Sequence, residues 1–133
     1  MTHSEFDKLT IKEKCQLGDN ATTPHYILTL LSQDTNWEIR MAVCLNPITP
    51  SNILTALSLD KDESVRYYVA IHPNTPVATL TLLSKDKDED VRIQVATNFN
   101  TLPEVLEHLT HDKNQAVKLS AKTTLRKLSR PNK

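Results

Sequence analysis

Four cations recur along the chain at intervals of 26 residues, and each follows an aspartate by six positions. The pairs are Asp34 with Arg40, Asp60 with Arg66, Asp86 with Arg92, and Asp112 with Lys118. Cations repeated at the spacing of stacked helices can follow a phosphate backbone. A guanidinium buried beside a carboxylate would instead tie structural elements together. The sequence therefore offers two interpretations of one pattern, a nucleic-acid site and a structural ladder.

Two other clusters carry groups that bind metal ions. His108 and His111 lie three residues apart beside Asp112, a spacing that puts both imidazoles on one face of a helix. No third ligand column supports them, so we interpret them as exposed polar residues that end a helix. The acidic run at Asp86, Asp88, Glu89 and Asp90 lacks the glycine turn and terminal glutamate of a calcium loop. It is interpreted as a solvated turn, and the sequence predicts no metal and no cofactor.

The two cysteines give no sign of redox or nucleophilic chemistry. Cys15 and Cys44 are too few for a disulfide framework and have no histidine nearby, and both lie among apolar residues. We predict free, packed thiols and a reducing, cytoplasmic setting. The repeated architecture described below explains most of the recurring polar residues as structural. With no reactive cysteine in addition, we predict that the chain is not an enzyme.

Composition limits the partners further. Among 133 residues, 16 Lys and Arg balance 16 Asp and Glu, so no overall basic field draws the chain to nucleic acid or to anionic lipid. No segment approaches the roughly 18 apolar residues of a membrane helix, and no secretory signal is visible. Gly18 is the only glycine, which excludes glycine-rich phosphate loops.

These residues must be positioned by a 26-residue, two-helix unit. The sequence predicts one all-α domain over 1–133, with an N-terminal capping helix in 1–19 and a C-terminal cap and tail in 124–133. Between them lie four units, 20–45, 46–71, 72–97 and 98–123. Such caps are needed because a lone repeat cannot bury its own faces. Ser4 is the predicted helix cap within 1–19.

The first helix of each unit is predicted to begin at a threonine followed by proline, one residue later in the first three units and two residues later in the fourth. The threonines are Thr23, Thr49, Thr75 and Thr101. We interpret each threonine as the N-cap of a first helix. Its hydroxyl would accept a hydrogen bond from a backbone N–H that has no partner within the helix. The buried stripe of these helices is predicted at Leu28, Leu54, Leu80 and Leu106, and at Leu31, Leu57, Leu83 and Leu109.

The second helix of each unit follows the aspartate. Its predicted core columns contain Val43, Val69 and Val95, and then the small residues Cys44, Ala70 and Ala96, which allow helices to approach closely. At 100° per residue, Arg40 lies between these columns, opposite a varied stripe at 38, 42 and 45 that we expect to face solvent. The ladder is therefore preferred to phosphate binding.

The units NPITPSNILTALSLDKDESVR and HPNTPVATLTLLSKDKDEDVR resemble leucine-rich repeat variant units, which belong with HEAT-like α-solenoids. The resemblance covers residues 20 to about 125 and implies a right-handed α–α superhelix. It also implies that each aspartate pairs with the arginine six residues later. Some proteins of this kind hold an iron–sulfur cluster on N-terminal cysteines. This chain has only Cys15 there, so that cofactor is not carried over.

Aromatic residues break the repeat pattern and are the candidates for partner contact. Trp37 stands where other units have Glu63, Glu89 or Gln115, and Tyr67 and Tyr68 likewise depart from their columns. Tyr68 is predicted to be exposed, with Trp37, Tyr67 and Gln94 as neighbours. Filling of space between units by Trp37 and Tyr67 is an equally good interpretation.

We expect a protein-binding adaptor or scaffold for a protein or peptide. A nucleic-acid-binding module, of the sort found among HEAT-like DNA-repair glycosylases, and a structural or inhibitory subunit of a larger complex stay open as alternatives. The oligomeric state is left open.

Overall fold

The computed structural model describes residues 1–130, which form ten helices and, within that range, no strand. The all-α class is confirmed. Two helices precede the predicted units: α1 (His3–Asp7) and α2 (Ile11–Gly18). The first helices are α3 (His25–Ser32), α5 (Ser51–Leu57), α7 (Val77–Leu83) and α9 (Pro103–Leu109). The second helices are α4 (Trp37–Leu45), α6 (Glu63–Ile71), α8 (Glu89–Thr97) and α10 (Gln115–Ser129).

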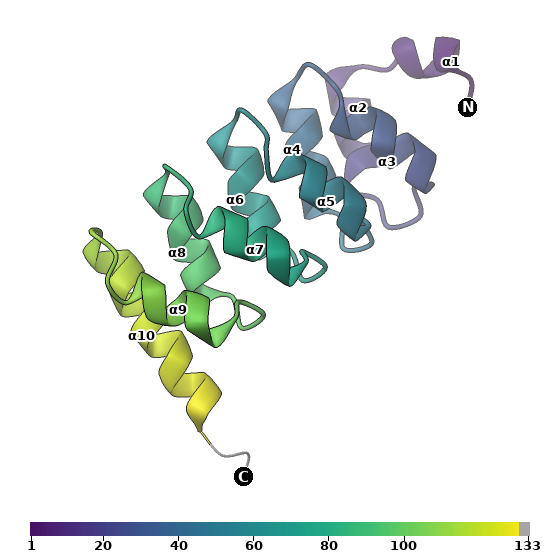
Figure 1. Cartoon of the computed structure of the whole chain (residues 1–133). Coiled ribbons are helices and arrows are strands. Elements are labelled where there is room, and N and C mark those ends of the chain that lie inside the picture. The colour runs from purple at the N-terminus through teal and green to yellow at the C-terminus, as the bar shows by residue number, and fades with distance from the viewer. Residues whose placement is uncertain (131–133) are drawn as a thin grey trace.

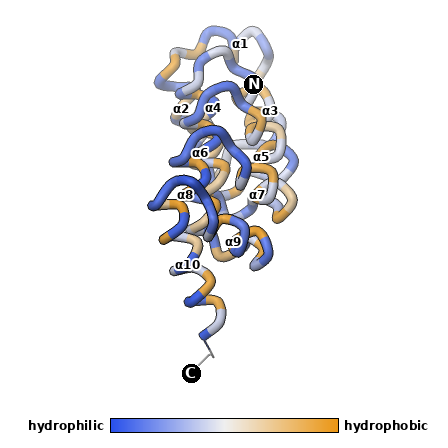
Figure 2. Tube along the Cα trace, turned by 60° about the vertical axis from the view of Figure 1, so that its left-hand side comes forward, coloured by the Kyte–Doolittle hydropathy of each residue, from blue (hydrophilic) through white to orange (hydrophobic). Residues whose placement is uncertain are grey.

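The helices lie in two layers (Figure 1). α2, α4, α6, α8 and α10 form one layer, in which each helix packs against the next, and the first helices lie beside it. The N-terminus and the end of α10 are at opposite ends of this row. Hydrophilic stretches gather beside α4, α6 and α8, where the turns rich in Asp and Lys lead into the second helices (Figure 2).

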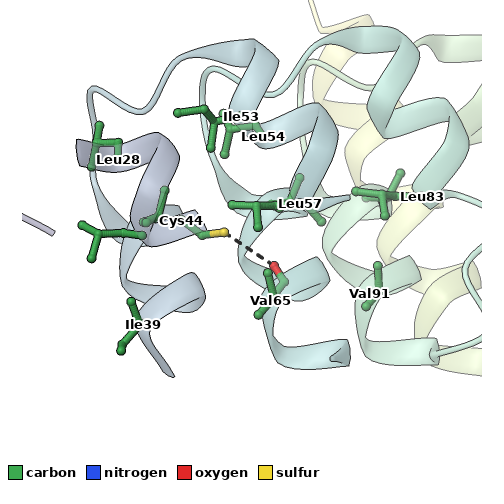
Figure 3. Packing of buried hydrophobic residues seen from close by; sticks show 14 of the residues in the cluster. Leu28, Ile39, Cys44, Ile53, Leu54, Leu57, Val65, Leu83 and Val91 are labelled. Carbon is green, nitrogen blue, oxygen red and sulfur yellow. Dashed lines mark hydrogen bonds between the residues drawn. The ribbon is translucent and has the colours of Figure 1, made fainter. Parts of the chain in front are cut away.

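The core lies between the two layers and follows the predicted columns. Both leucine stripes of the first helices are buried, with exposed fractions of 0–4%. The second helices contribute Ile39, Val65, Val91 and Val117, which are equally buried. Figure 3 shows Leu54, Leu57 and Leu83 together with Val65 and Val91 in this core. Burial of these apolar side chains is the main source of stability for such an arrangement.

Close packing between second helices depends on small side chains. A Cβ built on Gly18 of α2 would lie 2.8 Å from the Cβ of Ala42 in α4. Ala42 is only 4% exposed, although its column was predicted to face solvent. The prediction was wrong because Ala42 faces α2, the preceding helix of the same layer.

The threonine prediction was wrong in its chemistry. The residues that precede α3, α5, α7 and α9 are Pro24, Pro50, Pro76 and Leu102, and no side chain caps these helices. Each threonine instead donates its hydroxyl backwards, to a carbonyl near the end of the preceding helix. The bonds are Thr23 to Leu17, Thr49 to Val43, Thr75 to Val69 and Thr101 to Val95, at 2.6–2.8 Å. Each of these carbonyls also accepts a backbone N–H, such as that of His72 at Val69, so the threonine hydroxyl supplies a second hydrogen bond at the end of the preceding helix.

Side-chain caps occur on the other helices. Asn36, Asp62, Asp88 and Asn114 cap the second helices, two residues after the recurrent aspartates. Thr2 and Thr10 form complete capping boxes on α1 and α2. The prediction of Ser4 as a cap was wrong, because Ser4 lies inside α1.

The ends of the chain extend the same arrangement. α2 packs against α3 and α4, in the place predicted for an N-terminal cap. α10 is longer than the other second helices and runs beyond residue 123 to Ser129. The cap and tail predicted for 124–133 include residues 131–133, which lie outside the described part of the chain. The division into four units stays a prediction.

Candidate binding surface on the second helices

The recurrent arginines form buried ion pairs, but with the aspartate of the following unit. Arg40 donates from Nε to Oδ2 of Asp60 at 2.7 Å and from Nη2 to Oδ1 at 3.0 Å. Arg66 is paired in the same way with Asp86, and Arg92 with Asp112. The pairing predicted within each unit was wrong. Toward its own unit, each arginine donates to the main-chain carbonyl of the aspartate and not to its carboxylate, as Arg40 does to Asp34 at 2.9 Å, and Arg40 also donates to the carbonyl of Thr35 at 3.1 Å.

The local fold of the aspartates explains this direction. One carboxylate oxygen of Asp60 accepts the N–H of Asp62 at 2.9 Å, which holds the side chain at the start of its own second helix. The same bond forms at Asp34, Asp86 and Asp112. From that position the carboxylate faces the arginine of the preceding second helix, and the side chains of Arg40 and Asp60 are only 8% and 7% exposed.

The ion pairs shift the ionisation of their members. Burial acts to raise the pKa of Asp60, but hydrogen bonds from Arg40 and the Asp62 N–H, together with nearby positive charge, outweigh it and lower the pKa. The pKa of Asp112 is lowered by the same balance of effects, with Arg92 as the donor. The pKa of Arg66 is raised, chiefly by its hydrogen bond to Asp86. All three groups are therefore held in their charged forms.

The two ends of the ladder differ. Lys14 of α2, which stands 26 residues before Arg40, pairs with Asp34 at 3.2 Å. Lys118 was predicted to pair with Asp112, but Asp112 is bound to Arg92, and Lys118 forms no ion pair within residues 1–130. Because the three guanidiniums are buried and paired, they are not free to contact a phosphate backbone.

A second polar column also works internally. Asn46 donates from its side-chain amide to the carbonyls of Gly18 and Asn20, both at 2.8 Å. His72 places Nε2 2.7 Å from the carbonyl of Asn46, and its Nδ1 accepts the Asn74 N–H. Nε2 therefore carries the proton and donates. The polar residues that end second helices thus connect one unit to the preceding one.

Neither Cys44 nor the histidine pair lies in surroundings that favour nucleophilic or metal chemistry. Burial raises the pKa of Cys44 to about 12, and its Sγ lies 3.8 Å from the carbonyl of Val65 (Figure 3). A thiol so poorly ionised is a weak nucleophile. His108 and His111 line one groove, but Lys85, Lys87 and Lys113 line it as well, and these cations disfavour a metal ion. Within residues 1–130 no group of three or more His, Cys, Asp or Glu side chains could hold a metal.

The four aromatic and amide candidates do not form one cluster. Tyr68 is half-buried, not exposed as predicted, because its column faces the preceding second helix. It packs edge-on against Tyr67, with ring centres 5.2 Å apart. Gln94 lies in a groove with Ala70 and Ile71 of the preceding helix. Trp37 is 42% exposed, so it does not simply fill space between units.

An apolar strip crosses the second-helix layer and was not predicted from the sequence. Its members share two repeat positions, four residues apart and so on one face of each helix. They are Met41, Tyr67, Ile93 and Leu119, with Leu45 and Ile71. Leu119, Leu45 and Ile71 are 53%, 47% and 45% exposed, and the others are half-buried. The sequence signal for this strip was the recurrence of apolar residues at repeat positions outside the predicted core.

Acidic residues flank the strip at one point. A groove between α6 and α8 is lined by Tyr67 and Ser64 together with the carboxylates of Glu63, Asp88 and Asp90. Glu63 and Asp90 are exposed. An aromatic ring beside several carboxylates attracts a cationic side chain.

Comparison with family models, curated proteins and solved structures finds no match to this chain. No helix within residues 1–130 is long and apolar enough to cross a membrane.

Proposed function

We propose that this chain is a non-enzymatic adaptor or scaffold that binds a protein or peptide across its second helices. We also propose that its four 26-residue units form a right-handed solenoid of the leucine-rich repeat variant or HEAT-like kind. The observation that carries the proposal is the apolar strip, which leaves Leu45 of α4, Ile71 of α6 and Leu119 of α10 open to solvent, with the half-buried Ile93 of α8 between the last two. Contiguous exposed apolar surface with a polar rim is typical of interaction sites.

The polar residues support binding in preference to catalysis. Arginine, aspartate, asparagine and threonine recur in every unit or nearly so, and their side chains bond to neighbouring parts of the same chain. A catalytic site needs a convergent set of groups that the fold does not use in this way.

The acidic groove beside the strip indicates that the partner carries a positive charge. Glu63 and Asp90 stand beside the ring of Tyr67, close to the exposed Ile71 on the same helix. A partner segment with an apolar side chain for the strip and a Lys or Arg for the groove is complementary to this surface.

A peptide-display selection against the whole chain tests the proposal, followed by fluorescence anisotropy of the selected peptides. Ile71→Glu places a charge in the strip and is expected to weaken binding at least about tenfold. Leu82→Glu is the matched control, because Leu82 has a similar exposure (52%) but lies on α7 in the other layer. Its binding is expected to change less than about twofold.

Three results would overturn the proposal: no peptide selected by the wild type, wild-type affinity in the Ile71→Glu variant, or an equal loss in both variants. Circular dichroism must first show that each variant is folded. Leu45→Glu replaces Ile71→Glu if that variant does not fold, because Leu45 occupies the same repeat position. Light scattering of the isolated chain measures its oligomeric state. It separates an adaptor, whose strip is open to solvent, from a structural subunit, whose strip would be covered in a stable oligomer.

A further inference from the structure

The zero net charge of the chain hides a separation of charge along it. All 16 acidic residues lie at or before Asp112, where nine Lys and Arg accompany them, so residues 1–112 carry a net charge of −7. The remaining residues contain seven Lys and Arg and no acidic residue, a net charge of +7. Asymmetry of this size between two parts of one chain indicates an electrostatic role for the basic part.

The basic residues are arranged on the outward side of α10. Lys122 and Arg126 are spaced by four, and so lie about 40° apart around the helix and about 6 Å apart along it. Arg130 follows at the same spacing as the C-cap residue of α10. Lys127 lies to one side of this row. All four side chains are exposed, and none forms an ion pair within residues 1–130. Figure 1 shows that this half of α10 extends past α8 and α9, away from the acidic part of the protein.

The stability of the helix accounts for only part of this charge. Cations in the last turn favour a helix, because they offset the partial negative charge of its carboxyl end. Arg126 and Lys127 occupy that turn, but Lys122 does not. α4, α6 and α8 end without any basic residue in the last turn. Second helices therefore form in this protein without cations in the last turn, and the row of basic residues on α10 needs another explanation.

We infer that the outward face of α10 binds the phosphate backbone of a double-helical nucleic acid. A row of flexible cations without carboxylates matches a ligand whose charge is regular and negative. Residues 113–130 contain no aromatic side chain on which an unpaired base could stack, so a duplex, whose bases are already stacked, is the form favoured. The contact is independent of base sequence, because only phosphates are reached.

The burial of the other face of α10 argues against two other anionic partners. A basic helix that binds a lipid surface, or the groove of an acidic protein, inserts its apolar face. The side of α10 that faces the neighbouring helices is covered, since Val117, Ala121 and Thr124 are 0–3% exposed. Leu119 and Leu128 are 53% and 43% exposed, but they are nine residues apart and so lie on opposite sides of the helix. α10 therefore offers no continuous apolar face to a lipid surface or a protein groove, whereas charge alone is sufficient for a phosphate backbone.

Fluorescence anisotropy with a short DNA duplex of mixed sequence tests the inference on the full chain. About four phosphate contacts predict a loss of about 100-fold in affinity between about 50 mM and 200 mM salt. The triple variant Lys122→Gln, Arg126→Gln, Arg130→Gln is expected to bind at least tenfold more weakly. Its slope of log affinity against log salt should be smaller by about three.

The matched control changes Lys61, Lys85 and Lys87 to Gln, because these exposed lysines give the same change in charge but alternate with aspartates in the turns. This variant is expected to keep its affinity within about threefold. Equal loss in both triple variants, or no loss in the α10 variant, would overturn the inference. So would tighter binding to a single strand, or to vesicles with anionic lipid at equal phosphate concentration. Ile71→Glu should bind the duplex normally, so failure of the peptide proposal is distinguishable from failure of this one.

Discussion

The guanidinium of Arg66 binds the carboxylate of Asp86 in the next unit, with Nε 2.8 Å from Oδ2, while its Nη1 donates to the main-chain carbonyl of Asp60 in its own unit. One side chain thus joins three segments: its own helix, the turn that precedes it and the turn of the following unit. Both side chains of the ion pair are nearly excluded from water. A pair in this position couples adjacent units, and its loss should weaken the fold as a whole.

Arg66→Ala is expected to lower the free energy of unfolding by about 3 kcal/mol or more, because the carboxylate of Asp86 is left buried without its partner. Chemical denaturation followed by circular dichroism measures this. Lys118→Ala is the control, since Lys118 occupies the same repeat position without an ion pair and its loss should cost much less. A double-mutant cycle should find strong coupling of Arg66 to Asp86 and little to the side chain of Asp60. The reverse result would contradict the pairing across units.

The free energy of unfolding should decrease at low pH because the aspartates of the ion pairs become protonated. The pKa of Asp60 in the folded chain is below its ordinary value of 3.8, so the unfolded chain takes up the proton first as the pH falls. The stabilisation from Asp60 is therefore complete above the ordinary value and is lost as the pH decreases through 3.8 toward the lower folded value. Denaturant midpoints measured over this range should decrease for the wild type and decrease less for Asp60→Asn. Glu104→Gln, which changes an exposed carboxylate that forms no ion pair among the described residues, should retain the wild-type dependence.

Gly18→Ala tests the close approach of α2 and α4. In an unconstrained helix this change would stabilise by about 1 kcal/mol. Here the new methyl group would lie 2.8 Å from the Cβ of Ala42 and 3.3 Å from backbone atoms of α4. We expect a net loss of about 1 kcal/mol or more, measured as the free energy of unfolding. The double variant with Ala42→Gly should recover part of the loss, and a more stable single variant would show that the helices can separate freely.

Substitution of Thr75 tests whether its hydroxyl acts as a hydrogen-bond donor to the preceding helix or as an N-cap. Its Oγ1 donates to the buried carbonyl of Val69 at 2.6 Å. Thr75→Val keeps the shape but leaves that carbonyl with only the His72 N–H as a donor, and is expected to cost about 1 kcal/mol. Thr75→Ser keeps the donor and should cost less. Thr29→Val removes a hydroxyl bond on an exposed helix face and serves as the control. If its thermal unfolding shifts as far as that of Thr75→Val, burial of the bond is not what matters.

Both the helical class and the buried columns followed from the sequence. Leu28 and Leu54 recur at one position of a 26-residue period, and Leu31 lies on the same helical face as Leu28. Both features are local, since periodicity along a helix determines which side chains share a face.

Only the tertiary structure decided which unit supplies each partner. The spacing of Asp60 and Arg66 suggested a pair within one unit, whereas the carboxylate is turned toward Arg40 by its bond to the Asp62 N–H. A helical wheel likewise gives the direction of Tyr68 but not the position of the preceding helix that half covers it. The basic residues of α10 were visible in the sequence, but which of them are exposed depends on the packing of α8 and α9. Contacts between units are set by how whole helices approach one another, and no local pattern along the chain encodes that distance.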